Sequence, residues 1–328
     1  MGDSVKDRSY QHSDSLYQSD RRRMLLVRVL LTGSTGFLGK NLKPILEQSY
    51  EVIGTNSTWD LTNQSKAEYI VQKYRPDVVI HAAGTVGGIQ ANKENPGKFM
   101  YNNLAMGLNV IEASHKYRVP KFILLGTVCA YPKYTSIPFK EEDLWNGYPE
   151  ETNAPYGIAK KTLMRLVQAY HEQYQFNGVN LIPVNMYGPH DHFNLTSSHV
   201  IPALILKFHN AMKKNEDITL WGTGQASREF LYAEDCANAI NLAIQKDIGP
   251  DPINIGTCKE IKIIEVAEMI ADIMDFRGAI FFDSTKPDGQ PRRCLDTSKA
   301  KDRLGFEAKT NLRDGLIKTI EWYKQSGL

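Results

Sequence analysis

Cysteine is scarce in this chain, and its cysteines are never closely paired. Only four occur in 328 residues, and no two form a C-x-x-C motif: Cys129, Cys236, Cys258 and Cys294. Zinc sites and disulfide frameworks use cysteines at short or regular spacings. The spacing therefore predicts neither a metal site nor disulfides, and it favours the reducing environment of the cytoplasm.

Long apolar runs and basic stripes are missing as well. No stretch approaches the roughly 20 apolar residues that a helix needs to cross a bilayer, so we expect no membrane segment. The net charge is only +2, from 39 Lys and Arg against 37 Asp and Glu mixed along the chain. A nucleic-acid surface would gather its basic residues. We expect no nucleic-acid partner, and any anionic ligand must be held by a local site.

The first 23 residues resemble neither a domain nor a targeting segment. They are rich in Ser, Asp and Gln and poor in aliphatic residues, which predicts a disordered tail over residues 1–23. Arg21–Arg23 followed by Met24–Leu31 imitates a signal peptide. Arg28 interrupts that run, however, and no small-residue cleavage site follows it. The run is better interpreted as the first strand of a sheet.

From residue 24 onward, short aliphatic runs alternate with helical patterns, which is typical of βαβ units and a parallel sheet. We predict strands at Val27–Leu31, Glu51–Thr55, Asp77–His81, Lys121–Gly126 and Val179–Val184, and helices at about 36–48, 96–117 and 156–176. Beyond about residue 185 loops interrupt shorter elements. The length and the 42% hydrophobic content suit one large domain with a smaller lobe. The predicted fold is α/β, with a Rossmann-type doubly wound sheet over 24–184 and a C-terminal lobe over 185–328, some segments of which return to the larger domain.

A glycine-rich turn directly follows the first predicted strand and opens a helix, with glycines at G-x-x-G-x-x-G spacing. Such a turn lets a pyrophosphate approach backbone N–H groups at a helix N-terminus, where a Cβ would block it. The strand–turn–helix context makes a dinucleotide site a better interpretation than a merely tight turn. The candidate cofactor-binding residues of the turn are Gly33, Ser34, Thr35, Gly36, Phe37, Leu38 and Gly39.

Further cofactor contacts are expected at two other strand ends. Ala82 and Ala83 end a strand on the same edge, where small residues let a dinucleotide lie flat over the sheet. Asp60 and Leu61 are candidates to contact the adenine, although Asp60 is equally well interpreted as a turn cap. An acid after the second strand would select NAD and an arginine NADP. Gly54–Ser57 offers neither, so the local sequence leaves NADPH and NADH open.

A tyrosine and a lysine four residues apart mark the predicted chemistry. Tyr156 and Lys160 share one face near the start of a helix, and an ammonium beside a phenol lowers the pKa of the tyrosine. The phenol can exchange a proton with a carbonyl or alcohol while hydride moves to or from a nicotinamide. Thr127, at the end of the preceding strand, supplies a hydroxyl for the same substrate oxygen. The alternative interpretation is an ordinary amphipathic surface helix.

The order of these features resembles the extended short-chain dehydrogenase/reductase superfamily. Further segments resemble one branch of it, the GDP-L-fucose synthases, from about residue 27 to the C-terminus. The matching segments are Val86–Ile89, Gly126–Lys133, Pro155–Lys160, Asn185–Asp191, Ser198–Ala203, Trp221–Gly224, Arg228–Phe230 and Lys286–Arg292.

The resemblance implies an NADPH-dependent epimerase-reductase that acts on a GDP-4-keto-6-deoxy sugar. Cys129 would then be the base and His199 the acid that invert C3 and C5, before hydride reduces C4. Thiolate and imidazole suit these roles near neutral pH. Without the resemblance, Cys129 is interpreted as a small core residue and His199 as a residue at a helix N-terminus.

The resemblance also implies substrate contacts and an assembly. The candidate substrate-binding residues are Asn185, Lys207, Trp221, Arg228 and Lys286, whose simpler interpretations are loop capping, core packing and solvated surface charge. Relatives pair through two long helices, here about 96–117 and 156–176, so a homodimer is expected. Thr127 replaces the usual serine, and Lys207 stands where arginine is frequent.

Three alternatives stay open. The same chemistry on a colitose-type or 6-deoxy-heptose precursor differs by one hydroxyl or one carbon. A reductase without epimerase activity is disfavoured because both Cys129 and His199 are present. A non-catalytic nucleotide sensor is disfavoured by the intact Tyr156 and Lys160.

Overall fold

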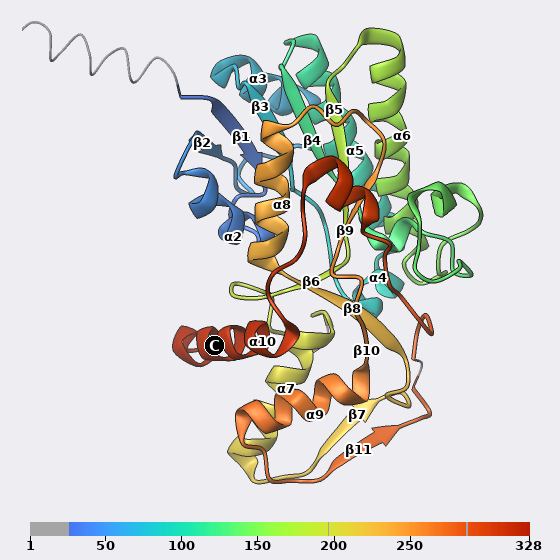
Figure 1. Cartoon of the computed structure of the whole chain (residues 1–328). Coiled ribbons are helices and arrows are strands. Elements are labelled where there is room, and N and C mark those ends of the chain that lie inside the picture. Colours follow the sequence, from blue (N-terminus) through green and yellow to red (C-terminus); the bar gives the residue numbers. More distant parts are fainter. Residues whose placement is uncertain (1–25, 196, 287) are drawn as a thin grey trace, which may run out of the picture.

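The computed structural model describes residues 26–195, 197–286 and 288–328 (Figure 1). The tail predicted over residues 1–23 lies outside these ranges. The buried apolar side chains form two clusters, a larger one and a smaller one, and the chain passes between them several times. None of the helices in the described ranges combines the length and the apolar character that a bilayer crossing requires.

A six-stranded sheet forms the centre of the larger cluster, and the sequence pattern predicted every strand of it except β9. Its strands lie in the order β2-β1-β3-β4-β5-β9, and every neighbouring pair is parallel. The strands β3, β4 and β5 are buried along their whole length, as expected where helices cover both faces. Their bounds are β1 Arg28–Thr32, β2 Glu51–Gly54, β3 Val78–His81, β4 Lys121–Leu125, β5 Gly178–Pro183 and β9 Ile253–Ile255.

Helices pack on this sheet in two groups. The helices α3, α5 and α6 lie side by side, and α2 packs against α8 (Figure 1). The predicted Rossmann-type, doubly wound fold class is confirmed. The bounds are α2 Phe37–Leu46, α3 Gln64–Tyr74, α5 Pro96–Lys116, α6 Ala154–Tyr174 and α8 Ala233–Gln245.

The two long predicted helices are present with small shifts at their ends. Helix α5 begins at Pro96, because a proline without an N–H is tolerated in the first turn. Helix α6 begins two residues before Tyr156, with Pro155 in its first turn. It ends at Tyr174, because Gln175 adopts a left-handed conformation with φ of 57°.

The second cluster contains elements that the sequence pattern did not resolve. A three-stranded sheet, β10-β8-β6, and a two-stranded sheet, β11-β7, lie with helices α7, α9 and α10 (Figure 1). The bounds are β6 Asn185–Tyr187, α7 Val200–Lys214, β7 Ile218–Trp221, β8 Ser227–Tyr232, β10 Glu260–Lys262, α9 Ile263–Met274, β11 Ile280–Asp283 and α10 Leu312–Ser326. The short elements α4 Ile89–Glu94, η1 Val128–Ala130, η2 Glu141–Trp145 and η3 Ala300–Leu304 complete the chain.

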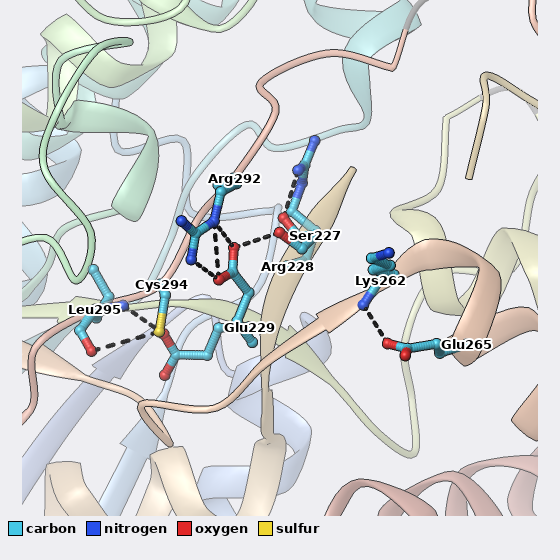
Figure 2. A network of polar contacts seen from close by, with 9 residues as sticks. Ser227, Arg228, Glu229, Lys262, Glu265, Arg292, Cys294 and Leu295 are labelled. Carbon is cyan, nitrogen blue, oxygen red and sulfur yellow. Dashed lines mark hydrogen bonds and ion pairs between the residues drawn. The ribbon is translucent and has the colours of Figure 1, made fainter. Parts of the chain in front are cut away.

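A buried carboxylate joins the strands near the boundary of the two clusters. Glu229 of β8 is fully buried and accepts backbone N–H groups from Leu295 at 2.6 Å, from Cys258 at 2.8 Å and from Thr257. Figure 2 shows Glu229 beside Cys294 and Leu295. Burial raises the pKa of this carboxyl, and the three N–H donors oppose that shift. Glu229 thus holds β8, the loop after β9 and the strand-like segment at Leu295 in one arrangement.

Removing this acceptor will destabilise the fold. In Glu229→Ala the buried N–H of Leu295 and the partly buried N–H groups of Thr257 and Cys258 lose their partner, at about 1 kcal/mol each, so we expect a loss of about 3 kcal/mol in the free energy of unfolding, measured by urea titration. Glu307→Ala is the control, because that side chain forms only an exposed pair with Lys301 and should leave the midpoint nearly unchanged. Equal losses in both variants would refute the role of Glu229.

Candidate active site

The glycine turn between β1 and α2 is compact because backbone segments touch there. Gly33 has φ of +70°, and a Cβ on it would lie 2.8 Å from Cα of Ala83. A Cβ on Gly39 would lie 2.6 Å from Cα of Ser34. Neither position has room for a side chain, which explains why glycine is needed at both.

Hydrogen bonds tie this turn to the ends of β2 and β3. The backbone N–H and the hydroxyl of Ser34 both donate to the carbonyl oxygen of Thr55, at 3.0 and 2.9 Å. The Thr32 hydroxyl oxygen accepts the N–H of Ala83 at 3.1 Å and lies 3.0 Å from Nδ1 of His81. Burial, and then the charge of Lys160, lower the pKa of His81 to about 3, so its ring stays neutral.

Helix α2 presents its N-terminus to the space beside this turn. Gly36 is the N-cap and no side chain caps the helix. Uncapped N–H groups at the positive end of a helix dipole attract an anion. Phe37 is partly buried and Leu38 is buried at this point. The turn therefore has the shape and the donors that a pyrophosphate group requires.

The other predicted cofactor contacts lie at the neighbouring strand ends. Ala82 and Ala83 are partly buried directly after β3. Asp60 is exposed, and its carboxylate accepts the Thr62 N–H at 3.1 Å and the Thr62 hydroxyl at 2.6 Å, which lower its pKa. Leu61 is buried. The structure thus gives Asp60 the contacts of a turn cap, and its adenine contact stays a prediction.

Three predicted catalytic side chains come together where η1 meets α6. The Thr127 hydroxyl caps η1 and accepts the N–H of Cys129 at 3.2 Å. The phenol of Tyr156 lies close enough to this hydroxyl and to Cys129 for both groups to influence its pKa. A Cβ on Gly157 would lie 2.9 Å from the carbonyl carbon of Cys129, so glycine allows this close approach.

The direction of the Tyr156 shift differs from the prediction. Burial is the largest influence and raises the pKa of the phenol, Cys129 raises it further, and only Thr127 lowers it. Burial also lowers the pKa of Lys160 to about 8. The Lys160 Nζ lies 3.8 Å from where a Cβ on Gly84 would be, beside the strand end at Ala83. Tyr156 is consequently a neutral phenol near pH 7, which suits a proton donor.

The sequence did not single out Arg293, which the structure brings into this group. Its Nη1 donates to Sγ of Cys129 at 3.6 Å and to Oδ1 of Asn185 at 3.3 Å. The arginine is buried. Asn185 also donates to the carbonyl oxygen of Glu229 at 2.9 Å, so its side chain is held from both ends. The signal available in the sequence was only the position of Arg293 one residue after the matching segment Lys286–Arg292.

His199 is the N-cap residue of α7 and lies within electrostatic range of Arg293. The loop before it packs on the segment after β3, where Gly88 N–H donates to Ser197 at 2.9 Å and a Cβ on Gly88 would lie 2.5 Å from the Ser198 oxygen. The residue is exposed. Desolvation, then the charges of His192 and Arg293, lower the pKa of its imidazole.

A second group of predicted residues lies in the smaller cluster. The ammonium groups of Lys207 and Lys286 lie 5.5 and 5.8 Å from the ring centroid of Trp221, whose side chain is 58% exposed. Arg228 donates to the carbonyl oxygens of Ser227 at 2.7 Å and Asp288 at 3.3 Å. Burial, followed by the charge of Arg293, lowers the pKa of Arg228 to about 10. Cys129 lies within electrostatic range of Arg228.

The predicted site residues therefore lie in three groups. These are the glycine turn with its neighbouring strand ends, the cluster around Cys129 and Tyr156, and the cationic side chains around Trp221. Within the described ranges, no cluster of three or more His, Cys, Asp or Glu side chains is placed to hold a metal ion.

This geometry defines a class of protein. A dinucleotide turn at the carboxyl edge of a parallel sheet, next to a Thr–Tyr–Lys group, is the arrangement of a nicotinamide-dependent enzyme that acts on a carbonyl or alcohol. The family described as "NAD dependent epimerase/dehydratase family" matches residues 29–256, and the chain belongs to it.

Individual relatives narrow the comparison. The chain is 42% identical to a GDP-L-fucose synthase of Sinorhizobium fredii, over 90% of this chain and 94% of that protein. It is 35% identical to a GDP-L-colitose synthase of Yersinia pseudotuberculosis, over 90% and 98%. The crystal structure of a GDP-L-fucose synthetase from Naegleria fowleri bound to NADP matches with a TM-score of 0.84 and 28% identity, over 92% of this chain and 94% of that one. The predicted resemblance to the GDP-L-fucose synthases is confirmed.

The crowding at the glycine turn generates a test. Gly39→Ala forces a Cβ against the backbone of Gly33 and Ser34, so we expect it to lower the free energy of unfolding by about 2 kcal/mol or more. Thermal melting measures the effect. Gly97→Ala is the matched control, because nothing lies within 4 Å of the added methyl and alanine favours a helix. A Gly39 variant as stable as the Gly97 variant would contradict the close contact.

Proposed function

We propose that this protein is an epimerase-reductase of the GDP-L-fucose synthase type. It would invert C3 and C5 of GDP-4-keto-6-deoxy-D-mannose and then reduce C4, giving GDP-L-fucose. The observation that supports this most directly is that Cys129 lies in one group with Thr127 and Tyr156. In addition, the Arg293 guanidinium contacts the sulfur of Cys129, and its charge influences His199. A reductase alone would have no need of a thiol near its phenol, or of an imidazole in electrostatic range of the arginine that contacts this thiol.

The proposed cofactor is NADPH, bound across the glycine turn. The compact turn at Gly33 and the uncapped N-terminus of α2 suit a pyrophosphate group. The small side chains of Ala82 and Ala83 leave space for the dinucleotide over the edge of the sheet. When bound, the cofactor supplies hydride to C4. Ser34 and Thr35 are uncharged, so an added phosphate on the ribose meets no acidic side chain there. The NADP-bound structure of a related enzyme supports NADPH over NADH.

The epimerase steps use the acidity of the hydrogens beside the keto group. The Cys129 thiolate removes the proton at C5 or C3, and the electron pair moves to the C4 oxygen as an enolate. The hydroxyls of Thr127 and Tyr156 stabilise that oxygen. The protonated imidazole of His199 returns a proton to the carbon from the other face. Repeating the exchange inverts the second centre.

The reduction needs an acid at the same oxygen. Because burial keeps Tyr156 protonated, its phenol can give a proton to the oxygen as hydride reaches C4. Lys160, largely protonated near pH 7 with its pKa at about 8, stabilises the phenolate that remains. Tyr156 would therefore serve both reactions.

The nucleotide would bind in the smaller cluster. Lys207, Lys286 and Arg228 supply positive charge for the diphosphate, and the exposed Trp221 offers an aromatic face to the guanine. Asn185, fixed between Glu229 and Arg293, would orient the sugar. On this proposal residues 24–184 bind the dinucleotide and residues 185–328 mainly the sugar nucleotide. The cysteine usage supports a cytoplasmic protein.

A homodimer is part of the proposal. Helix α5 carries exposed apolar side chains at Tyr101 and Leu108, with 66% and 42% of their surface exposed. A second copy packing its own α5 and α6 there would cover them.

The product assay tests the function and separates it from its closest alternatives. We expect GDP-4-keto-6-deoxymannose to be converted with oxidation of NADPH faster than of NADH, and NMR to identify GDP-L-fucose. A product with the mannose configuration at C3 and C5 would indicate a reductase only. Turnover only of a 3,6-dideoxy substrate would favour the colitose-type activity, for which the Yersinia relative is the specific support. No oxidation of either cofactor with any of these substrates would refute the proposal.

Two variants separate the epimerase and reductase steps. Cys129→Ser should slow exchange of the C3 and C5 hydrogens with deuterated water by about 100-fold or more, whereas Tyr156→Phe should slow cofactor oxidation at least as much, because each removes a proton-transfer group. Cys258→Ser, at an exposed free cysteine, is the control and should exchange normally. Normal exchange in Cys129→Ser, or full-rate reduction in Tyr156→Phe, would remove that residue from its role.

A further inference from the structure

Arg293 is a buried cation without an acidic partner. Its residue is 7% exposed, and none of the ion pairs found among the described residues includes it. Its neighbour Arg292, labelled in Figure 2, behaves differently: its side chain is 60% exposed and forms an ion pair with Glu260. A buried charge costs several kcal/mol unless an opposite charge or a set of hydrogen bonds compensates it.

The acceptors around Arg293 identify where that opposite charge can form. Nε and Nη2 donate to the Gln290 side-chain oxygen at 3.2 and 2.9 Å, and Nη1 donates to Asn185 at 3.3 Å and to Cys129 at 3.6 Å. The two amides are neutral at all relevant pH values. The Cys129 sulfur is the one acceptor in this set that can become an anion.

The position of the guanidinium is fixed from two sides. Gln290 holds the Nε edge, and its own amide donates to the carbonyl oxygen of Lys133 at 3.1 Å. Lys133 lies in the segment that follows Cys129, so one amide side chain fixes Arg293 relative to the loop of the thiol. Asn185, itself bonded to Glu229, fixes the Nη1 edge. The guanidinium cannot easily move away from the sulfur.

We propose that Arg293 is the positioning residue of Cys129: its buried guanidinium contacts the sulfur and stabilises the negative charge that forms when the thiol loses its proton, which prepares Cys129 to act as the base. This inference rests on the proposed function for the role of the base, but not for the state of the sulfur. A guanidinium stays protonated throughout the working range of the enzyme and stabilises an adjacent sulfur anion through a charge-assisted hydrogen bond.

The positive charge of Arg293 also acts on His199, the proposed acid. After desolvation and the charge of His192, the charge of Arg293 lowers the pKa of the His199 imidazole. When Cys129 has accepted the proton from carbon, the sulfur is neutral and Arg293 again lacks a counter-ion. Loss of the proton from sulfur to solvent restores the pair. One arginine therefore contacts the sulfur of the proposed base and acts on the charge of the proposed acid.

Alkylation of Cys129 measures the state of the sulfur without substrate or cofactor. Full-length protein is treated with iodoacetamide at about pH 7, and mass spectrometry follows modification of the peptides that contain Cys129 and the exposed Cys258. Because the thiolate is the reactive form, Arg293→Gln should slow modification of Cys129 by about tenfold relative to Cys258. Arg293→Lys should restore most of the rate, because it keeps a charge, and Arg292→Gln should leave it unchanged.

The outcomes separate charge from structure. An unchanged Cys129 rate in folded Arg293→Gln would overturn the proposal, and so would an Arg293→Lys protein as slow as Arg293→Gln. Should Arg293→Gln not fold, Gln290→Ala releases the guanidinium while keeping its charge. It should slow modification of Cys129 severalfold, and a wild-type rate there would equally overturn the idea. Failure of the product assay with normal alkylation behaviour would refute the proposed function and leave the Arg293–Cys129 pair intact.

Discussion

The close approach of helix α6 to the short helix η1 is the constraint on which the candidate site depends. Only hydrogen at the Cα of Gly157 allows the helix to touch the backbone of Cys129. That contact sets Tyr156, the preceding residue, against Thr127 and places the thiol in the same group. A helix displaced by one methyl group would separate the phenol from the threonine hydroxyl. The chemistry thus depends on backbone packing before it depends on any side-chain charge.

The larger part of the fold was predictable because its signals are local. Strands with an apolar centre such as Lys121–Leu125 and a proline at the start of α5 are recognised from a few neighbouring residues. The smaller cluster was not resolved because its strands are short and pair with distant segments. Strand β11 pairs with β7, some 60 residues away, and β10 with β8. No periodicity within a short window contains those partners.

The site shows the same division between local and distant information. The glycine turn and the Tyr156–Lys160 spacing are local patterns, and the structure brings the predicted residues into connected groups. The pKa direction of Tyr156 was wrong, because burial outweighs what the lysine spacing suggested. Arg293 was missed because its importance comes from contacts with Cys129 and Asn185, 164 and 108 residues earlier in the chain. For Asp60 the structure shows only the local contacts of a turn cap, and its predicted adenine contact stays a prediction.

The path of the chain has a consequence for how this protein can be divided. After the first five strands the chain leaves for the smaller cluster, yet it comes back to lay α8 on the main sheet and to add β9 as its last strand. It returns once more with Leu295 and η3. A gene fragment that stops after β5 would therefore encode an incomplete sheet with an unpaired edge and an uncovered apolar face. The dinucleotide half is not a portable module, and chimeras between relatives would have to exchange several separate segments at once.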